Sequence, residues 1–229
     1  MITLDERVAA GMRLQLATRA ERLRDGDRPL GWKVGFGSPA AMARLGIDRA
    51  LVGFLLRSNL LPDGAEVPLD GWAAPALEPE VAVHLARDVP PGASWDDVRR
   101  AVAGLSAAIE LADVHPPPAD VRDILAGDIF HRHVLIGPVR DGVTTTDGVR
   151  ARVLLDGSPV DGTDDVTELT GEPVEVVRRT AELLEACGER LRAGEVVITG
   201  SVLPPPAVVT GQTVTVDLGS LGGLTVSLR

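Results

Sequence analysis

The stretch 76-ALEPEVAVHLA-86 restricts the fold most strongly, because it alternates like a strand and yet carries two carboxylates. In a strand, residues i and i+2 point to the same face of the sheet. The two faces are then Leu77, Val81, Val83 and Leu85 on one side, and Glu78, Glu80, Ala82 and His84 on the other. The first face can pack on a core. On the second face, two neighbouring carboxylates repel each other, and burying either one is costly unless another group compensates.

Two interpretations of Glu78 and Glu80 are open at this point. The pair can be the solvated outer face of an amphipathic strand, since exposed glutamates are common. It can also bind a divalent cation, because hard cations such as Mg²⁺ prefer oxygen ligands. A second predicted strand, 106-SAAIELAD-113, carries a third carboxylate, Glu110, flanked on its face by small residues. The small neighbours would leave room beside all three carboxylates.

The composition excludes several classes of protein. The 229 residues have a net charge of −10 and 3% aromatic residues, with no tyrosine, so a basic and aromatic nucleic-acid surface is not expected. No apolar run reaches membrane-spanning length, and the N-terminus lacks the order of segments typical of a signal peptide. The single cysteine, Cys187, excludes an internal disulfide. We therefore expect a cytoplasmic protein with neither a nucleic-acid nor a membrane partner.

The chain uses its basic residues very unevenly. Of 23 Lys and Arg residues, only Lys33 is a lysine. A compact ammonium on a flexible stem differs from a planar guanidinium, so position 33 is a candidate for a site that needs this donor. The alternative is that one lysine persists there by chance.

The coarse secondary structure combines a few helices with many short strands. Helices are predicted over residues 3–24 with Thr3 and Glu6 as a capping box, from Pro39 to Gly46, over about 95–105 with caps at Ser94 and Asp97, and over about 173–186. Besides the two glutamate strands, a strand followed by a turn is predicted within 31–38 and again within 53–64. Further strands are predicted at 133–137, 150–157, 195–199, 207–210, 213–218 and 224–228. This pattern indicates an α+β fold. With no repeat or linker, residues 1–229 are expected to form one domain, with a helical part at about 1–50 and a β core at about 51–229.

Several motifs, in this order, resemble the fumarylacetoacetate hydrolase superfamily. They are 31-GWKVGFGS-38, the E-x-E strand LEPEVAVHL, the segment AIELADVH and 194-GEVVITGSVLPP-205. The closest resemblance is to the branch of 2-keto-4-pentenoate hydratases and 4-oxalocrotonate decarboxylases. It covers nearly the whole chain, and the order and spacing of the motifs carry it more than any single motif.

The resemblance implies a curved, mostly antiparallel β roll with flanking helices, assembled as a homo-oligomer. It implies a lyase that acts on a small 2-oxo acid, with Glu78, Glu80 and Glu110 as ligands of Mg²⁺ or Mn²⁺. Lys33 would bind the substrate carboxylate or assist proton transfer. Ser58 and Thr199 would contact the substrate as well.

The chain departs from the family pattern at two places. In 53-GFLLRSN-59, Ser58 stands where hydratases carry an acidic residue, and a serine cannot act as a carboxylate base. The segment 127-GDIFHRH-133 replaces a family loop, so that His131 is either a substitute acid/base or a solvent-facing loop histidine. His84, on the glutamate face, is either an outer neighbour of the site or a residue at the strand end.

Four functions remain open at the level of sequence. Hydration of a 2-hydroxydienoate is the leading interpretation. Decarboxylation of a 2-oxo-enedioate follows, because it needs no activated water and tolerates the loss of an acid at position 58. The others are C–C hydrolysis of an acylpyruvate and an inactive structural partner of an active homologue.

Overall fold

A computed structural model describes residues 2–117, 119–206 and 208–229. The helices are α1 (Glu6–Arg24), α2 (Pro39–Leu45), α3 (Trp95–Ala101), α4 (Val121–Ala126) and α5 (Pro173–Ala186). The strands of the first sheet are β1 (Pro29–Gly35), β2 (Leu51–Leu56), β3 (Leu60–Leu61), β5 (Pro75–Leu85), β6 (Val102–Asp113), β7 (His131–Ile136), β8 (Arg140–Asp141) and β11 (Val196–Ser201). Those of the second sheet are β4 (Ala65–Val67), β9 (Ala151–Leu155), β10 (Ser158–Thr163), β12 (Thr213–Asp217) and β13 (Gly223–Leu228). None of the helices within the described ranges has the length and apolar character needed to cross a membrane.

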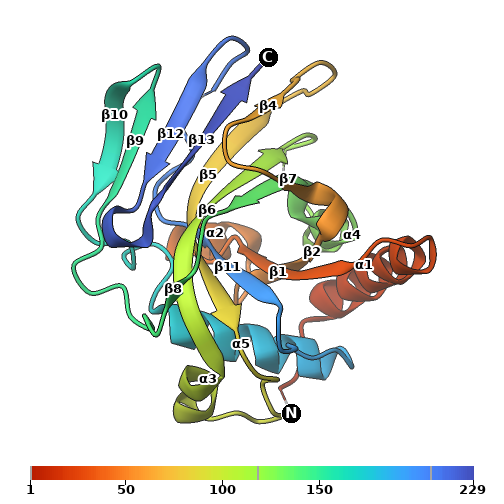
Figure 1. Cartoon of the computed structure of the whole chain (residues 1–229). Coiled ribbons are helices and arrows are strands. Elements are labelled where there is room, and N and C mark those ends of the chain that lie inside the picture. The colour runs from red at the N-terminus through yellow and green to blue at the C-terminus, as the bar shows by residue number, and fades with distance from the viewer. Residues whose placement is uncertain (1, 118, 207) are drawn as a thin grey trace.

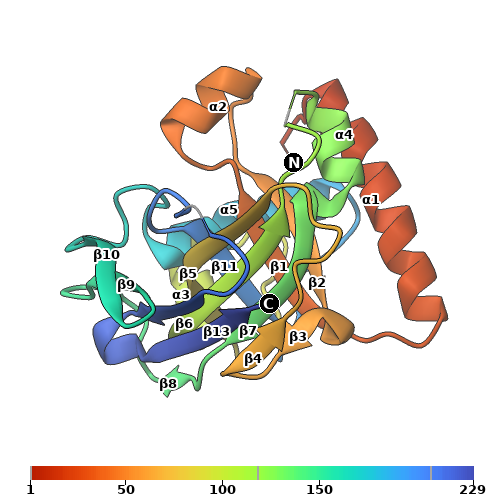
Figure 2. The same cartoon turned by 90° about the horizontal axis from the view of Figure 1, so that it is seen from above.

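Two curled sheets with helices around them form the molecule (Figure 1). The first sheet runs in the order β2-β1-β11-β5-β6-β7-β3, with β8 beside β6, and the second in the order β10-β9-β12-β13-β4. Most neighbours are antiparallel, while β1–β11, β3–β7 and β4–β13 are parallel. Strands β9 and β10 lie at the side of the molecule opposite α1 in both views (Figures 1 and 2). The predicted α+β fold with a curved, mostly antiparallel β roll is confirmed.

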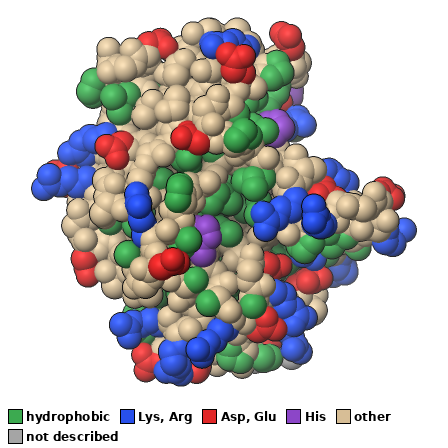
Figure 3. Space-filling view, in the orientation of Figure 1, with side chains coloured by type: hydrophobic (Ala, Val, Ile, Leu, Met, Phe, Trp, Pro, Cys, Tyr) green, Lys and Arg blue, Asp and Glu red, His purple; other side chains and the backbone are tan. Residues whose placement is uncertain are grey.

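The alternation along β5 determines which side chains enter the main core. Leu77, Val81 and Val83 are buried in the core that the first sheet shares with the helices and the second sheet. Ala82 points to the other face and belongs to a smaller apolar cluster with Leu30, Leu55, Ala108, Val134, Val196 and Ile198. On the face shown in Figure 3, hydrophobic side chains gather near the middle and charged side chains lie mostly toward the edges. The glutamates therefore share their sheet face with alanines and with larger aliphatic residues.

The ends of α1 and α3 agree only in part with the predicted helix boundaries. The prediction of Thr3 as the cap of α1 is wrong, because Asp5 caps this helix and its carboxylate accepts the Arg7 N–H at 2.7 Å. The capping box of Ser94 and Asp97 on α3 is confirmed. However, α3 ends at Ala101, and β6 starts at Val102 without a loop. The predicted helix over 95–105 was therefore too long.

Two further differences concern the second half of the chain. Residues 208–210 form no strand, and residue 207 of that predicted strand lies outside the described residues. Helix α4 was not predicted, although Asp120 caps it by accepting the backbone N–H groups of Arg122 and Asp123. Strand β1 lies between β2 and β11 and so contributes part of residues 1–50 to the first sheet. The division into one domain with a helical N-terminal part stays a prediction.

Gly11 lets α1 approach α4 closely. A Cβ at position 11 would lie 2.7 Å from the Leu125 Cβ and 2.8 Å from the Arg122 carbonyl oxygen. We predict that Gly11→Ala destabilises the protein by roughly 1 kcal/mol or more. Overpacking typically costs about 1–3 kcal/mol, while alanine gains only about 0.5–1 kcal/mol of helix preference. Urea unfolding measures the change, with the exposed Thr18→Ala in the same helix as control. A stabilised Gly11→Ala variant would contradict the close packing.

Candidate active site

Three glutamates meet where β5 and β6 pair. In the antiparallel register Glu78 lies opposite Glu110, and Glu80 lies opposite Ala108. All three side chains point to the same sheet face, and one carboxylate oxygen from each lies within 4.8 Å of the other two. The structure therefore brings together the three carboxylates that the sequence singled out.

The environment of these carboxylates opposes three full negative charges. Burial, and after it the charge of Glu110, raises the pKa of Glu78 to about 7. Burial and the charges of Glu110 and Glu78 raise the pKa of Glu80 well above its usual value. Burial also acts to raise the pKa of Glu110, but Lys33 and His131 lower it overall. Without a further cation, a cluster in which one carboxyl group is protonated is more favourable than a cluster of three ionised carboxylates.

Two of the carboxylate oxygens have no hydrogen-bond partner. Glu80 Oε2 accepts the Gly200 N–H at 2.7 Å. Within the described part of the chain, nothing donates to Glu80 Oε1 or Glu110 Oε2, although both atoms are buried. Buried polar atoms without a partner are rare and call for an explanation. A set of converging, unpartnered carboxylate oxygens fits an Mg²⁺-like or Mn²⁺-like cation.

Lys33 is fixed between two acceptors beside this cluster. Its ammonium forms an ion pair with Glu110 Oε1 and donates to the Ile129 carbonyl oxygen at 3.0 Å, with its side chain 3% exposed. Burial acts to lower the pKa of Lys33, but the charges of Glu110 and Glu78 raise it overall. Gly53 makes this position accessible, since a Cβ there would lie 2.9 Å from Lys33 Cγ and 2.7 Å from Asp128 Oδ1. The only lysine is thus a buried, charged neighbour of the carboxylates.

Comparison with known proteins places the chain in a family. The family model of the fumarylacetoacetate hydrolase C-terminal region matches residues 36–229. The chain belongs to the fumarylacetoacetate hydrolase family. It is 31% identical over 210 residues to a 2-keto-4-pentenoate hydratase of Burkholderia vietnamiensis, covering 89% of this chain and 79% of the relative. It is 27% identical over 218 residues to a 4-oxalocrotonate decarboxylase of a Pseudomonas species, covering 94% and 83%.

Solved structures show the same fold. A 4-oxalocrotonate decarboxylase from Pseudomonas putida G7, complexed with magnesium and adipate, superimposes with a TM-score of 0.89 at 24% identity. The match covers 97% of this chain and 86% of that protein. The predicted resemblance to this hydratase and decarboxylase branch is confirmed, and the relatives are enzymes.

His131 lies closer to the carboxylates than a solvent-facing loop residue would. Its side chain is 2% exposed, and Nδ1 bonds Glu110 Oε1 at 2.8 Å. The solvent-facing alternative is therefore wrong, while a catalytic role for His131 stays a prediction. His84 bonds Ser106 Oγ at 2.8 Å, and no described contact joins it to the glutamates. The interpretation of His84 as a residue near the strand end fits this position.

Backbone strain is concentrated beside the site. Phe36 has φ 55°, and the consecutive residues Asp128, Ile129 and Phe130 have φ 52°, 50° and 63°. Such values are uncommon outside glycine and cost about 1–3 kcal/mol each when the surroundings enforce them. In this family member, the 128–130 segment presents the Ile129 carbonyl oxygen to Lys33. The strain therefore positions a group of the site.

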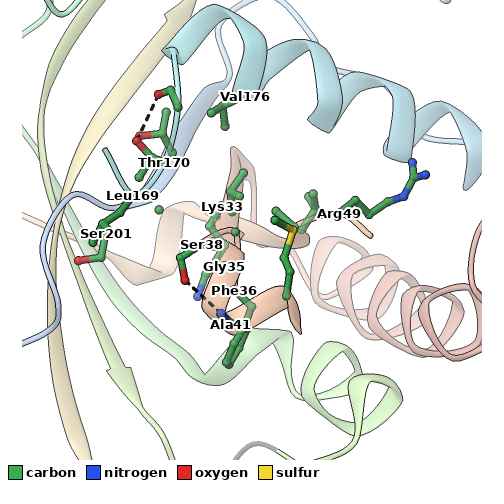
Figure 4. A pocket seen from close by; sticks show the side chains of 18 of the residues that line it. Lys33, Gly35, Phe36, Ser38, Ala41, Arg49, Leu169, Thr170, Val176 and Ser201 are labelled. Carbon is green, nitrogen blue, oxygen red and sulfur yellow. Dashed lines mark hydrogen bonds between the residues drawn. The ribbon is translucent and has the colours of Figure 1, made fainter. Parts of the chain in front are cut away.

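A cavity of about 930 Å³ opens onto Lys33 and Glu78. Figure 4 shows its walls, which include the turn after β1 with Phe36 and Ser38, Leu169 and Thr170 before α5, and Ser201 at the end of β11. Thr199 lines the cavity, but its hydroxyl donates to the Val81 carbonyl oxygen at 3.2 Å.

Ser58 lies elsewhere. It is exposed, bonds the side chains of Asp27 and Arg22, and is not part of the cavity lining. Its predicted contact with the substrate is therefore not part of the candidate site. Sequence reasoning also missed the Gly200 N–H, the Ile129 carbonyl and the 167–171 loop. The residue type does not show where a backbone N–H or carbonyl group will point. Only the Thr199-Gly200 pair in the motif 194-GEVVITGSVLPP-205 indicated one of these groups, the Gly200 N–H.

The mutual repulsion of the glutamates leads to a stability prediction. In a chelating buffer, Glu80→Gln should stabilise the protein by about 1 kcal/mol or more, since one pKa unit of such a penalty is worth about 1.4 kcal/mol. The amide oxygen can still accept the Gly200 N–H. Chemical unfolding measures the difference.

Glu195→Gln is the matched control. Glu195 is buried outside the cluster and accepts the Trp32 indole N–H at 3.3 Å and the Arg192 N–H at 2.8 Å. Burial raises the pKa of Glu195 as well, but Arg19 lies 3.9 Å from its carboxylate, so Glu195→Gln should stabilise the protein less than Glu80→Gln or not at all. Equal effects at positions 80 and 195 would argue against repulsion within the cluster.

Proposed function

We propose that this protein is a lyase that acts on a small 2-oxo or 2-hydroxydienoate acid with a divalent metal ion, in the manner of the hydratases. The observation that carries the proposal is the convergence of Glu78, Glu80 and Glu110 beside Lys33, with Glu78 and Lys33 lining one cavity. The names of the relatives support the reaction class. Magnesium, calcium and manganese occur in related solved structures, and we propose Mg²⁺ or Mn²⁺ for this all-oxygen donor set.

The three glutamates would hold the ion. When bound, such a cation supplies Lewis-acid polarisation for the keto oxygen of a 2-oxo acid. Lys33 would exchange Glu110 for the substrate carboxylate, because its ammonium can rotate between acceptors while its stem stays packed. The Ile129 carbonyl would keep the ammonium aimed during this exchange.

Asp128 is the group that we assign to the acid missing at position 58. Asp128 Oδ1 accepts the Phe54 N–H at 2.8 Å, and the carboxyl group flanks the Lys33 stem across Gly53. Burial raises the pKa of Asp128 well above its usual value, which favours its protonated form. Asp128 itself does not line the cavity. In this proposal its protonated carboxyl group would donate a proton to the substrate carbon during ketonisation from its position beside the Lys33 stem. His131, bonded to Glu110, would orient that ligand.

Decarboxylation of a 2-oxo-enedioate is the second candidate, because the similarity to a 4-oxalocrotonate decarboxylase extends over 94% of this chain. A single assay separates the two reactions. Formation of a 4-hydroxy-2-oxo acid from a monoacid dienoate without CO₂ release indicates hydration, whereas CO₂ release from an enedioate indicates decarboxylation. Neither activity in the presence of Mg²⁺ or Mn²⁺ would overturn the lyase proposal and favour an inactive structural partner.

The lysine leads to a sharp kinetic prediction. Lys33→Arg should lower kcat/KM about 10- to 150-fold, nearly as much as Lys33→Ala. A lost charge-assisted hydrogen bond costs about 1.5–3 kcal/mol, and we expect the wider, planar guanidinium not to reproduce the contacts of the ammonium with Glu110 and Ile129. Steady-state kinetics with saturating metal measure the effect.

The exposed Arg57→Lys is the reverse exchange and should leave activity unchanged. Wild-type activity in Lys33→Arg would show that position 33 needs only a positive charge.

Asp128→Asn tests the proposed acid. Asparagine keeps an oxygen for the Phe54 N–H but cannot supply the proton. We predict a fall in kcat of about 10²–10⁴-fold with little change in KM, as expected for a general acid. A proportional rise in KM with unchanged kcat would instead assign Asp128 to substrate binding.

A further inference from the structure

Two of the three phenylalanines in the chain line the candidate cavity. Only Phe36, Phe54 and Phe130 are present, and tyrosine is absent. Phe36 and Phe130 contribute to the cavity wall and are only partly buried. Phenylalanine and tryptophan together make up only six residues of the chain, and two of these six, Phe36 and Phe130, line a surface that a ligand can reach.

Both phenylalanines occupy backbone positions that disfavour them. Their φ angles of 55° and 63° are in the left-handed region, where glycine or asparagine is the usual residue. An aromatic side chain at such a position is better explained by what the ring contacts than by backbone preference. Phe36 follows Lys33 by three residues in the turn after β1. Phe130 lies between Ile129, which bonds Lys33, and His131, which bonds Glu110.

The cavity is larger than a three-carbon acid requires. Its volume of about 930 Å³ is in the range of sites that take drug-sized ligands. Besides the two rings, apolar side chains line it, among them Val34, Val52, Leu169 and Val176. A conjugated dienoate is flat and apolar beyond its carboxylate, and a flat π system packs well on aromatic faces.

Most arginines around the cavity already have an ion-pair partner. Arg178 and Arg179 pair with Glu175 at 2.7 and 2.8 Å, and Arg49 pairs with Asp48 at 3.1 Å. Among the arginines of this lining that the structure describes, Arg44 alone has no ion pair, and it is exposed on α2. A second carboxylate on the substrate would therefore lose hydration along the apolar wall and find few unpaired cations.

We infer that the cavity selects 2-oxo acids with an uncharged, flat or apolar tail over acids with a second carboxylate, and that Phe36 and Phe130 contact this tail. The inference rests on the proposed function and specifies its substrate class. It favours a monoacid dienoate, the substrate type of a hydratase, over an enedioate.

Two six-carbon acids test the selection directly. The acids 2-oxohexanoate and 2-oxohexanedioate differ only in a terminal methyl group against a carboxylate. Calorimetric titration of the Mg²⁺-loaded wild-type protein should give at least tenfold tighter binding of the monoacid. Across pyruvate, 2-oxobutanoate and 2-oxohexanoate, affinity should rise about fourfold per methylene, the equivalent of about 0.8 kcal/mol for each buried CH₂.

Two variants test whether the rings of Phe36 and Phe130 cause the selection for an uncharged tail. Phe36→Ala and Phe130→Ala should each weaken 2-oxohexanoate binding at least fivefold and leave pyruvate binding within twofold, with the leucine variants as substitutes if these fail to fold. Phe54→Leu, a buried phenylalanine outside the cavity lining, is the control and should not change the ratio.

The outcomes separate two failures. The protein could bind pyruvate and also bind 2-oxohexanedioate at least as tightly as 2-oxohexanoate. This result would overturn the tail selection alone, most clearly if Arg44→Ala abolished binding of the dicarboxylate. Absence of binding for every 2-oxo acid, pyruvate included, would overturn the proposed function and this inference with it.

Discussion

Two neighbouring strands carry three carboxylates into one buried space, and like charges at such separations repel each other. The surrounding structure compensates in part. Lys33 and His131 both bond Glu110, and the Gly200 N–H bonds Glu80. Two carboxylate oxygens remain without a donor among the described residues. Burial alone would destabilise this cluster, and the proposed divalent cation would supply the missing positive charge.

The fold can be understood as the support for this cluster. Sheet pairing places Glu78 opposite Glu110, while glycine at position 53 lets the lysine stem and Asp128 pass close to β2. The strained 128–130 segment aims a carbonyl oxygen at the ammonium. Strain of this kind persists only where neighbouring structure enforces it, which is why it marks functional sites more often than cores. The same segment contributes Phe130 to the cavity wall, so ligand contact and lysine position are linked through one short piece of chain.

Periodicity and local capping could be interpreted from the sequence because both depend on neighbouring residues. The alternation around Glu78 predicted its sheet face, and Ser94 with Asp97 predicted the start of α3. Features that depend on distant contacts could not be predicted. His131 is buried because a register shift between β6 and β7 turns it toward Glu110. Ser58 matched a family position in sequence, yet a 3₁₀ turn leaves it exposed beside Asp27.

The position of a bound ion tests the central claim most directly. Crystals grown with Mn²⁺ can be measured at a wavelength where manganese scatters anomalously. We expect one strong anomalous peak per chain, at about 2.0–2.3 Å from an oxygen of each of Glu78, Glu80 and Glu110, and we expect this peak to be lost in Glu110→Gln. If crystals at saturating Mn²⁺ showed peaks only elsewhere, or no peak at the three carboxylates, the proposed metal site would be contradicted.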